Sequence, residues 1–182
     1  MSTRPTPATP SASESRGFEV RPVRADELIE VGRLTGEVYV GDGFLDASDE
    51  YLDELADTAR RAEEAEIWVA VEEDAVLGSV TFCVAGSSFR EIARDDEGEF
   101  RMLAVNPAVR GRGVGQALVE LCVRRSRETG YAGVRMSSMD RMTSAHRVYE
   151  RLGFVRAPED DWSPAPGVTL LAYVLRFDGP VS

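Results

Sequence analysis

The stretch EFRMLAVNPAVRGRGVGQALVELCVRRSRETG, residues 99–130, decides the fold of this chain of 182 residues. Its first seven residues alternate and predict a strand over 99–105. The alternation is expected to place Glu99, Arg101, Leu103 and Val105 on one face and Phe100, Met102 and Ala104 on the other. Asn106-Pro107 ends this strand, because proline cannot donate to a β-ladder. Apolar residues at helical spacing from Val114 then predict a helix that ends at Gly130.

Three glycines of the sequence RGRGVG, residues 110–115, lie where the strand turns into the helix. Without β-carbons, the backbone can approach an anion closely and direct successive N–H groups at it. The helix N-terminus contributes further unpaired donors and a partial positive charge. The pattern therefore indicates a site for a phosphate or pyrophosphate.

Three kinds of phosphate loop compete for this segment. A Walker A loop needs a lysine after its last glycine, and the chain contains no lysine. A dinucleotide fingerprint needs Gly-x-Gly-x-x-Gly, but Gln116 follows Gly115, so the glycine spacing does not fit. The third pattern is Arg/Gln-x-x-Gly-x-Gly/Ala, and Arg110, Gly113 and Gly115 fill it completely.

Through this third pattern the chain resembles the GNAT N-acetyltransferase superfamily, in its bacterial type. The resemblance implies that acetyl-CoA is the cosubstrate and that its pyrophosphate binds on the loop. It also implies a set of residues that contact this cosubstrate: Leu103, Ala104, Val105, Arg110, Gly111, Arg112, Gly113, Val114, Gly115, Gln116 and Met142.

A second motif, MTSAHRVYERLGF at residues 142–154, carries the same resemblance. Members of the superfamily commonly show Asn-x-x-Ala-x-x-x-Tyr-x-x-x-Gly-Phe here, and Ala145, Tyr149, Gly153 and Phe154 match it. Met142 stands where the family usually has an asparagine, whose amide often bonds the pantetheine arm. This departure bears on one contact with the cofactor and leaves the tyrosine unaffected.

The remaining segments complete an α+β pattern. Residues 1–17 are rich in Pro, Ser, Thr and Ala, which predicts a disordered tail before a single domain at 18–178. Periodicity predicts helices at 26–40, 48–62 (capped by Ser48), 114–129 and 143–152, and strands at 18–24, 67–71, 76–84, 99–105, 134–138 and 168–177. This order predicts a mixed, mostly antiparallel sheet with helices on both faces. It is also the order of the GNAT acyl-CoA N-acyltransferase fold.

Composition excludes several classes of protein. A formal net charge of −11 argues against a partner made of nucleic acid and against a basic membrane-surface protein. The chain has no apolar run long enough to cross a bilayer and no signal-peptide core, so a cytoplasmic location is expected. Cys83 and Cys122 lack metal-ligand and redox spacing, which predicts buried, reduced thiols and no metal site. The sequence leaves a homodimer open.

Acyl transfer from a thioester to an amine needs a neutral amine, a stabilised oxyanion and a protonated leaving thiolate. A free alkylamine has a pKa of roughly 10 and is mostly charged at neutral pH, so a carboxylate near the acceptor can take its proton. The resemblance gives this role to Glu99, with Glu97 and Asp96 as alternatives. The other interpretation of Glu99 is an exposed charge at the strand edge, paired to Arg101 or Arg135.

The resemblance also assigns the other two tasks. The backbone N–H of Leu103 would stabilise the oxyanion, on a strand that separates from its neighbour to admit the pantetheine. Tyr149 would protonate the departing thiolate, because the pKa of a phenol, roughly 10, lies just above that of a thiol. The alternative makes Tyr149 a core aromatic. His146, the only histidine, forms no triad without a nearby nucleophile and is expected on the surface or in packing.

By the same resemblance, the acceptor pocket lies at residues 39–51 and 160–167. The first segment holds Asp42, Phe44 and Asp46, and such aromatic and acidic residues favour a cationic acceptor. The sequence thus predicts an N-acetyltransferase that moves an acetyl group from acetyl-CoA to a primary amine by direct transfer in a ternary complex. The alternative function is a catalytically silent acyl-CoA-binding regulatory module.

Overall fold

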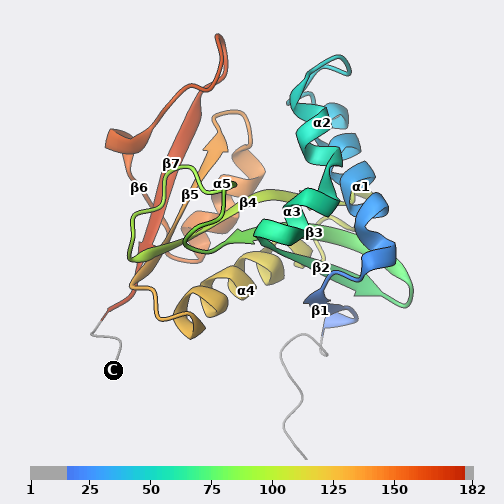
Figure 1. Cartoon of the computed structure of the whole chain (residues 1–182), viewed down its shortest axis with the longest axis horizontal. Helices are drawn as coiled ribbons and strands as arrows, with labels where there is room; N and C mark the ends of the chain where they lie inside the picture. The colour runs from blue at the N-terminus through green and yellow to red at the C-terminus, as the bar shows by residue number, and fades with distance from the viewer. Residues whose placement is uncertain (1–15, 179–182) are drawn as a thin grey trace, which may run out of the picture.

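A seven-stranded sheet forms the centre of the computed structural model, which describes residues 16–178 (Figure 1). The strand order is β1-β2-β3-β4-β5-β7-β6, and every neighbouring pair is antiparallel except β4 and β5. The strands are β1 (Glu19–Pro22), β2 (Glu66–Glu72), β3 (Ala75–Cys83), β4 (Glu97–Val105), β5 (Gly133–Met139), β6 (Val155–Arg156) and β7 (Leu170–Arg176).

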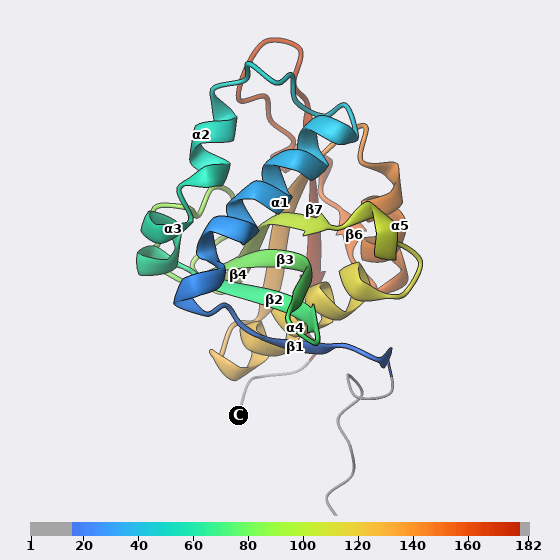
Figure 2. The ribbon, with the colours of Figure 1, turned by 90° about the vertical axis from the view of Figure 1, so that its right-hand side faces the viewer.

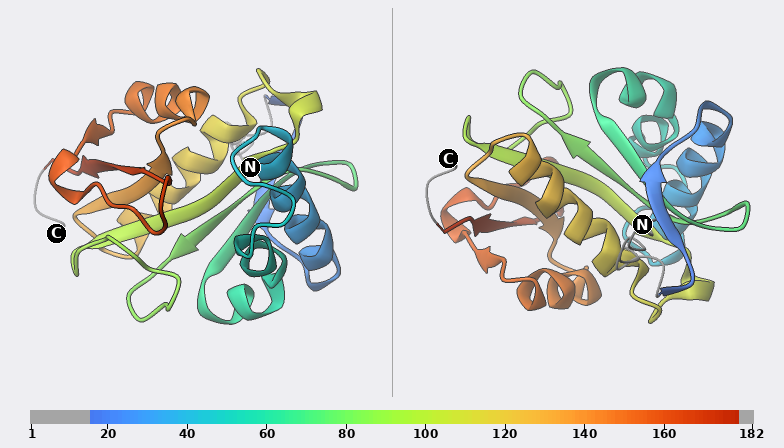
Figure 3. Two further views of the ribbon diagram at one scale, coloured as in Figure 1. Left: turned by 90° about the horizontal axis from the view of Figure 1, so that it is seen from above. Right: turned by 90° about the horizontal axis from the view of Figure 1, so that it is seen from below.

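Helices cover both faces of this sheet. They are α1 (Leu28–Gly41), α2 (Tyr51–Ala56), α3 (Thr58–Glu64), α4 (Val114–Glu128) and α5 (Thr143–Arg151), with 3-10 turns η2 (Ala25–Glu27), η3 (Pro107–Val109) and η4 (Pro158–Asp160). One apolar cluster joins α4 and α5 to the sheet, and a second joins α1 and α2 to its opposite face. In Figure 2 α1 crosses the sheet on the side toward the viewer, and the right-hand view of Figure 3, seen from below, brings α4 to the front. The predicted mixed, mostly antiparallel α+β architecture is confirmed.

The predicted second helix, 48–62, is wrong in one respect, because two short helices occupy that segment. The break falls at Asp57, whose backbone leaves the helical region at φ −77° and ψ 61°. Its side chain accepts a hydrogen bond from the N–H of Arg60 at 3.3 Å and so caps α3. Ser48 caps neither helix. The sequence does not predict β6, because its two residues are too few to show a period.

A β-bulge in β4 overturns the predicted alternation of its side chains. Met102 has φ +54°, and the pairing with β3 shifts between Thr81↔Arg101 and Ser79↔Ala104, so an extra residue stands in β4. Phe100, Leu103 and Val105 consequently pack in the α4 cluster, whereas Met102 and Ala104 pack in the α1 cluster. Glu99 pairs with Cys83 of the α1 cluster, so it lies on the face opposite Leu103, not on the same face.

Strands β4 and β5 separate along their length. They pair only at Glu97↔Gly133, Gly98↔Val134 and Glu99↔Arg135, although both strands continue beyond these residues. Figure 1 shows β4 and β5 diverging from this shared end. The predicted separation of the central strand from its neighbour is therefore present, and it opens the sheet beside Leu103.

The predicted disordered tail lies mostly outside the described residues, which begin at Arg16. Arg16 itself pairs with Glu120 of α4 at 3.3 Å. Within residues 16–178 no helix combines the length and apolar character needed to cross a bilayer.

Candidate active site

A cavity of about 880 Å³ lies over the end of β4 and the N-terminus of α4. Its walls come from the loop after β4, from α5 and from the end of α1. Among the predicted coenzyme-binding residues it is lined by Leu103, Val105, Arg110, Gly111, Arg112, Gly113, Val114, Gly115, Gln116 and Met142. Ala104 does not line it, because the bulge at Met102 turns Ala104 into the α1 cluster. The structure thus brings together two motifs that lie some distance apart in the sequence.

The glycine loop has the backbone that an anion site needs. Gly111 and Gly113 have φ +83° and +82°, and Gly113 is the N-cap residue of α4. A β-carbon built on either glycine would meet no atom within 4 Å, so open space faces the loop. The first N–H groups of α4 have no partner within the helix, and Gly113, Val114 and Gly115 at this end of the helix line the cavity. A phosphate group fits such a cradle.

Both arginines of the loop are held by carboxylates. Arg110 donates to Asp42 at 3.0 and 2.6 Å, and Arg112 donates to Glu72 at 3.2 and 2.5 Å. The Arg112 contact lowers the pKa of Glu72, chiefly through the hydrogen bonds. These two pairs fix the loop to the end of α1 and to β2.

The bulge leaves part of β4 without partners. Neither Met102 nor Leu103 has a pairing partner on the neighbouring strands β3 and β5. Arg61 of α3 is buried and donates to the Met102 sulfur, which holds the bulge from the α1 face. Leu103 lines the cavity from the other face. Its backbone N–H therefore lies in an unpaired stretch beside the cavity.

Tyr149 lies in the packed layer between α5 and the sheet. It is 2% exposed, and its ring lies 5.8 Å from that of Phe100 and 5.7 Å from that of Tyr173. Burial raises the pKa of Tyr149 well above its usual value, and a hydrogen bond with Ser138 partly opposes this rise. Ala145 of the same helix lines the cavity, although Tyr149 does not. The alternative of a core aromatic accounts for its packing.

Ser138 links Tyr149 to the cavity wall. Its hydroxyl lies 3.2 Å from His146 Nε2 and 3.6 Å from the sulfur of Met142, which lines the cavity. His146 Nε2 also lies 3.1 Å from the carbonyl oxygen of Met139. Burial lowers the pKa of His146, so its ring is neutral at neutral pH. The prediction of a packing role for His146 agrees with these contacts.

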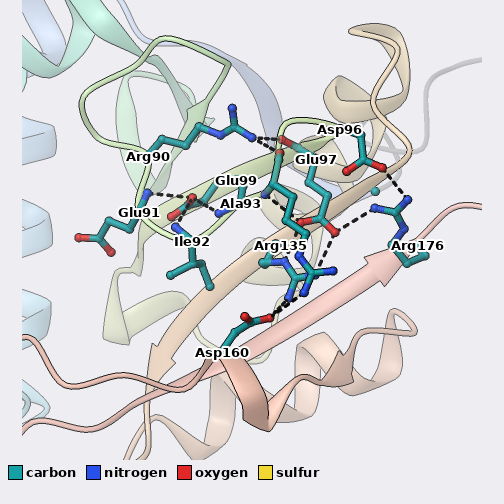
Figure 4. A network of polar contacts seen from close by, with 12 residues as sticks. Arg90, Glu91, Ile92, Ala93, Asp96, Glu97, Glu99, Arg135, Asp160 and Arg176 are labelled. Atoms are coloured by element: carbon teal, nitrogen blue, oxygen red, sulfur yellow. Dashed lines mark hydrogen bonds and ion pairs between the residues drawn. The ribbon is translucent and has the colours of Figure 1, made fainter.

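Glu99 is fully buried, so its interpretation as an exposed charge at the strand edge is wrong. Its Oε2 accepts from the backbone N–H groups of Glu91, Ile92 and Ala93 at 3.0, 3.0 and 2.9 Å (Figure 4). Its Oε1 is buried without a hydrogen-bond partner among residues 16–178. Its carboxylate forms no ion pair with Arg101 or with Arg135, which pair with Glu91 and Glu97. Glu99 thereby fixes the loop between β3 and β4.

The two alternative bases belong to a separate ion-pair network at the start of β4. Glu97 is fully buried and accepts from Arg135 at 2.6 and 3.1 Å and from Arg176 at 2.9 Å (Figure 4). Burial raises the pKa of Glu97, but these bonds outweigh it and the pKa is lowered. Asp96 is exposed and pairs with Arg176 at 2.7 Å. Both carboxylates are committed to arginines.

A polar cluster that the sequence analysis missed lies around Arg101, on the face of β4 opposite α4. Arg101 contacts Glu91 at 2.9 Å, Glu54 at 3.6 Å and the Tyr51 hydroxyl at 3.2 Å. Burial raises the pKa of Glu91 to about 7, Glu99 and Glu54 add to this rise, and Arg101 opposes it. The sequence shows the charges but not that a polar loop and α2 meet on β4.

The predicted acceptor segments do not present free carboxylates throughout. Asp42 is held by Arg110, and Asp161 accepts from Arg156 at 2.9 and 2.7 Å. Phe44 and Asp42 do line the cavity.

Cys83 and Cys122 are free and buried, as predicted. Within residues 16–178, no group of three or more side chains of the kinds that bind metals is placed to hold an ion.

Comparison with models of known protein families matches residues 35–154 to the Acetyltransferase (GNAT) family. This chain belongs to that family. Over 102 residues it is 31% identical to the N-acetylaspartate synthetase of Danio rerio, a match that covers 56% of this chain and only 34% of that protein. The chain thus spans a minor part of that relative's length.

Solved structures agree with the fold. An acetyltransferase of the GNAT family from Staphylococcus aureus Mu50 superposes with a TM-score of 0.70 at 12% identity, over 87% of this chain and 98% of that chain. The protein yncA from Salmonella typhimurium, solved with its cofactor acetyl-CoA, gives a TM-score of 0.66 at 17% identity, over 91% of this chain and 97% of that chain. The GNAT fold inferred from the two motifs is therefore confirmed.

Proposed function

We propose that this protein transfers an acetyl group from acetyl-CoA to a primary amine, by direct transfer in a ternary complex. The observation that carries the proposal is the opening of β4 from β5 beside a cavity that ends at the glycine loop. A long, flexible thioester can enter such an opening while its pyrophosphate remains on the N-terminus of α4. Membership of the GNAT family supports the same chemistry.

The loop residues Arg110 to Gln116 would hold the pyrophosphate, mainly through backbone N–H groups. Gly111 and Gly113 support this role because their positive φ angles direct the backbone toward open space. Met142 lines the wall where the pantetheine arm would pass. Leu103 would donate its N–H to the carbonyl oxygen as negative charge develops there, and its lack of a register partner supports this.

The proton transfers need one acid and one base. Tyr149 would protonate the leaving thiolate, and Ser138 partly offsets the rise that burial causes in the pKa of Tyr149. The sequence puts the base among the carboxylates at the start of β4, with Glu99 first, and this assignment stays a prediction. The direct mechanism needs both proton transfers to occur while the two substrates are bound together.

The acceptor would be a small amine. The name of the Danio rerio relative, N-acetylaspartate synthetase, points to aspartate as the acceptor of that protein, so amino acids belong in the first tests here. The test is release of free thiol from acetyl-CoA with a panel of amino acids, polyamines, aminoglycosides and a peptide N-terminus. Acetyl-CoA binding with no release of thiol above the hydrolysis rate would instead support the silent regulatory module.

A further inference from the structure

We propose that Glu91, on the loop between β3 and β4, is the group that accepts the proton of the acceptor amine. In this proposal Glu99 is a positioning residue that holds the backbone of Glu91. The inference rests on the proposed function and specifies the proton acceptor of that same site.

The contacts of Glu99 suit a structural role. Its carboxylate has no exposure, and one oxygen accepts three backbone hydrogen bonds from residues 91–93. Three charge-assisted bonds fix this carboxylate in one position. A substrate ammonium would have to displace the loop to reach it. What Glu99 does supply is a fixed backbone for Glu91.

The side chain of Glu91 is placed differently. It is 25% exposed, and Figure 4 shows it directed away from Glu99 and from the Glu97–Arg135 pair. One of its oxygens, Oε1, meets Arg101 Nη2 at 2.9 Å. Its other oxygen makes no hydrogen bond with any residue between 16 and 178, so it is free to meet a substrate.

The position of Arg101 brings Glu91 to the opening of the sheet. Arg101 comes two residues after the last pair between β4 and β5, and two residues before Leu103. Its contacts with Tyr51 and Phe89 place it on the α1–α3 face, whereas Leu103 lines the coenzyme cavity on the other face. Through its ion pair with Arg101, Glu91 lies on this α1–α3 face, and it is on this face that the proposal places the acceptor.

Burial and the neighbouring charges together set the basicity of Glu91. Burial disfavours the carboxylate most, Arg101 favours it, and Glu99 and Glu54 disfavour it further, so that the pKa of Glu91 is about 7. A base whose pKa lies near the working pH is half ionised there and still strong enough to accept a proton. Arg101 is in turn held by Glu54 and the Tyr51 hydroxyl, so the pair stays in place.

The proton balance is simple. The ammonium gives one proton to Glu91, and its nitrogen lone pair then forms the bond to the carbonyl carbon. The carbon–sulfur bond breaks, the thiolate takes a proton from Tyr149, and the second nitrogen proton restores Tyr149. Glu91 releases its proton to solvent, so one proton is released for each amide and each free thiol formed.

The test compares Glu91→Gln, Glu99→Gln and the matched control Glu54→Gln, a second carboxylate on Arg101. The pH profile of kcat/KM for the best amine is measured by thiol release at saturating acetyl-CoA. The carboxyl carbon of Glu91 is also titrated by NMR in the protein alone. Wild type should show an inflection near pH 7, where the NMR signal of Glu91 also titrates.

Glu91→Gln should lose about 10²-fold in rate at pH 7, approach wild type above the pKa of the amine, and lose the inflection. Glu99→Gln should keep the inflection but move it to lower pH, because a charge that raises the pKa of Glu91 is gone. Glu54→Gln should keep most of the rate, since Glu91 remains.

Two results would overturn the inference while leaving the proposed function intact. One is a Glu91→Gln variant with the rate and pH profile of wild type. The other is loss of the inflection in Glu99→Gln alone, which would return the base role to Glu99. If Glu99→Gln does not fold, Glu91→Gln still decides the matter. A wild-type protein that acetylates no amine would refute the proposed function, and this inference with it.

Discussion

Arg110 of the glycine loop donates hydrogen bonds from both terminal guanidinium nitrogens to Asp42 at the end of α1, with Nη1–Oδ1 and Nη2–Oδ2 distances of 3.0 and 2.6 Å. The pair places a negative charge at the rim of the cavity that we propose for an anionic ligand. An arriving pyrophosphate would compete with Asp42 for Arg110. The strength of that competition can be measured directly.

Asp42→Asn is expected to tighten acetyl-CoA binding by about 2- to 5-fold, which is the range of a partly exposed charge interaction. Arg110→Ala should weaken binding by about tenfold, since it removes a charged donor. Isothermal titration calorimetry at two salt concentrations measures both, and the effects should shrink at high salt. Arg33→Ala is the control, because Arg33 is an exposed arginine paired with Glu37 on α1. Weaker binding by Asp42→Asn would mean that Asp42 serves to shape the loop.

Gly113→Val is expected to abolish the rise in melting temperature that acetyl-CoA causes. A β-branched residue at φ +82° is strained, and its side chain would occupy the open space in front of the loop. Thermal unfolding with and without acetyl-CoA measures the effect, because a ligand that binds only the native state stabilises it. Gly41→Val is the matched control, since its β-carbon would also meet no atom within 4 Å and its φ is not positive. An unchanged shift in Gly113→Val would place the pyrophosphate elsewhere.

The parts of the site that the sequence predicted are those whose structure is decided locally. Positive φ at Gly111 and Gly113 and the start of α4 at Val114 follow from residues within one short segment. The 142–154 motif forms α5, whose helix is set by its own apolar face. Together with the strand and helix order, these segments were enough to predict the fold and the cavity wall.

The parts that could not be predicted depend on contacts between distant segments. The bulge at Met102 is held by Arg61 of α3, and it places Glu99 and Leu103 on opposite faces of β4, whereas regular alternation gives them the same face. The environment of Glu99 depends on a polar loop that folds back over β4. A period-2 pattern contains no information about either contact, because an extra residue in a strand looks the same in sequence as a regular one.

Glu97→Gln is expected to lower the free energy of unfolding by about 3 kcal/mol at pH 7, because it leaves Arg135 buried beside a weaker partner. The pKa of Glu97 is lowered in the fold from its ordinary value of 4.5. The contribution of the Glu97 carboxylate to the free energy of unfolding is therefore fully present above pH 4.5. It is lost as the pH falls through the pKa that Glu97 has in the folded protein. Urea unfolding at several pH values should show wild type and variant converging in acid. Asp96→Asn, an exposed carboxylate on the same Arg176, is the control and should change stability little. A difference in the free energy of unfolding between wild type and variant that persists at low pH would mean that Glu97 stabilises the protein by packing and not by its charge.

Ser138→Ala is expected to reduce kcat by about fivefold without changing the KM for acetyl-CoA. Its hydroxyl is the group that offsets the effect of burial on the Tyr149 phenol, and one such hydrogen bond is worth about 1 kcal/mol. Ser138→Thr should restore most of the rate, because it keeps the hydroxyl. Ser137→Ala, at the neighbouring position of β5, is the control. Equal losses in the Ala and Thr variants would show that the site tolerates only the volume of serine.

Tyr149→Phe tests the acid itself. The ring packs against Phe100, Phe154 and Tyr173, and phenylalanine keeps all of these contacts. Stability should therefore fall by no more than about 1 kcal/mol, the value of one hydrogen bond. Turnover with acetyl-CoA should fall roughly 10²-fold, while acetyl-CoA affinity changes far less, because the proton is needed only as the carbon–sulfur bond breaks.

The pH dependence separates an acid from a packing residue at this position. Burial raises the pKa of Tyr149 above its ordinary value of 10.0, so the phenol stays protonated throughout the working range. Removal of this hydroxyl in Tyr149→Phe should accordingly lower the rate by the same factor at every pH from about 6 to 9. Tyr149 should therefore add no inflection to the pH profile of the rate. Thiol release across that range, with calorimetric binding of acetyl-CoA at each end, measures both quantities. Full turnover in Tyr149→Phe would assign thiolate protonation to solvent and leave Tyr149 to its core packing. A collapse of both folding and turnover would show that the hydroxyl is needed for the structure of α5 and β5.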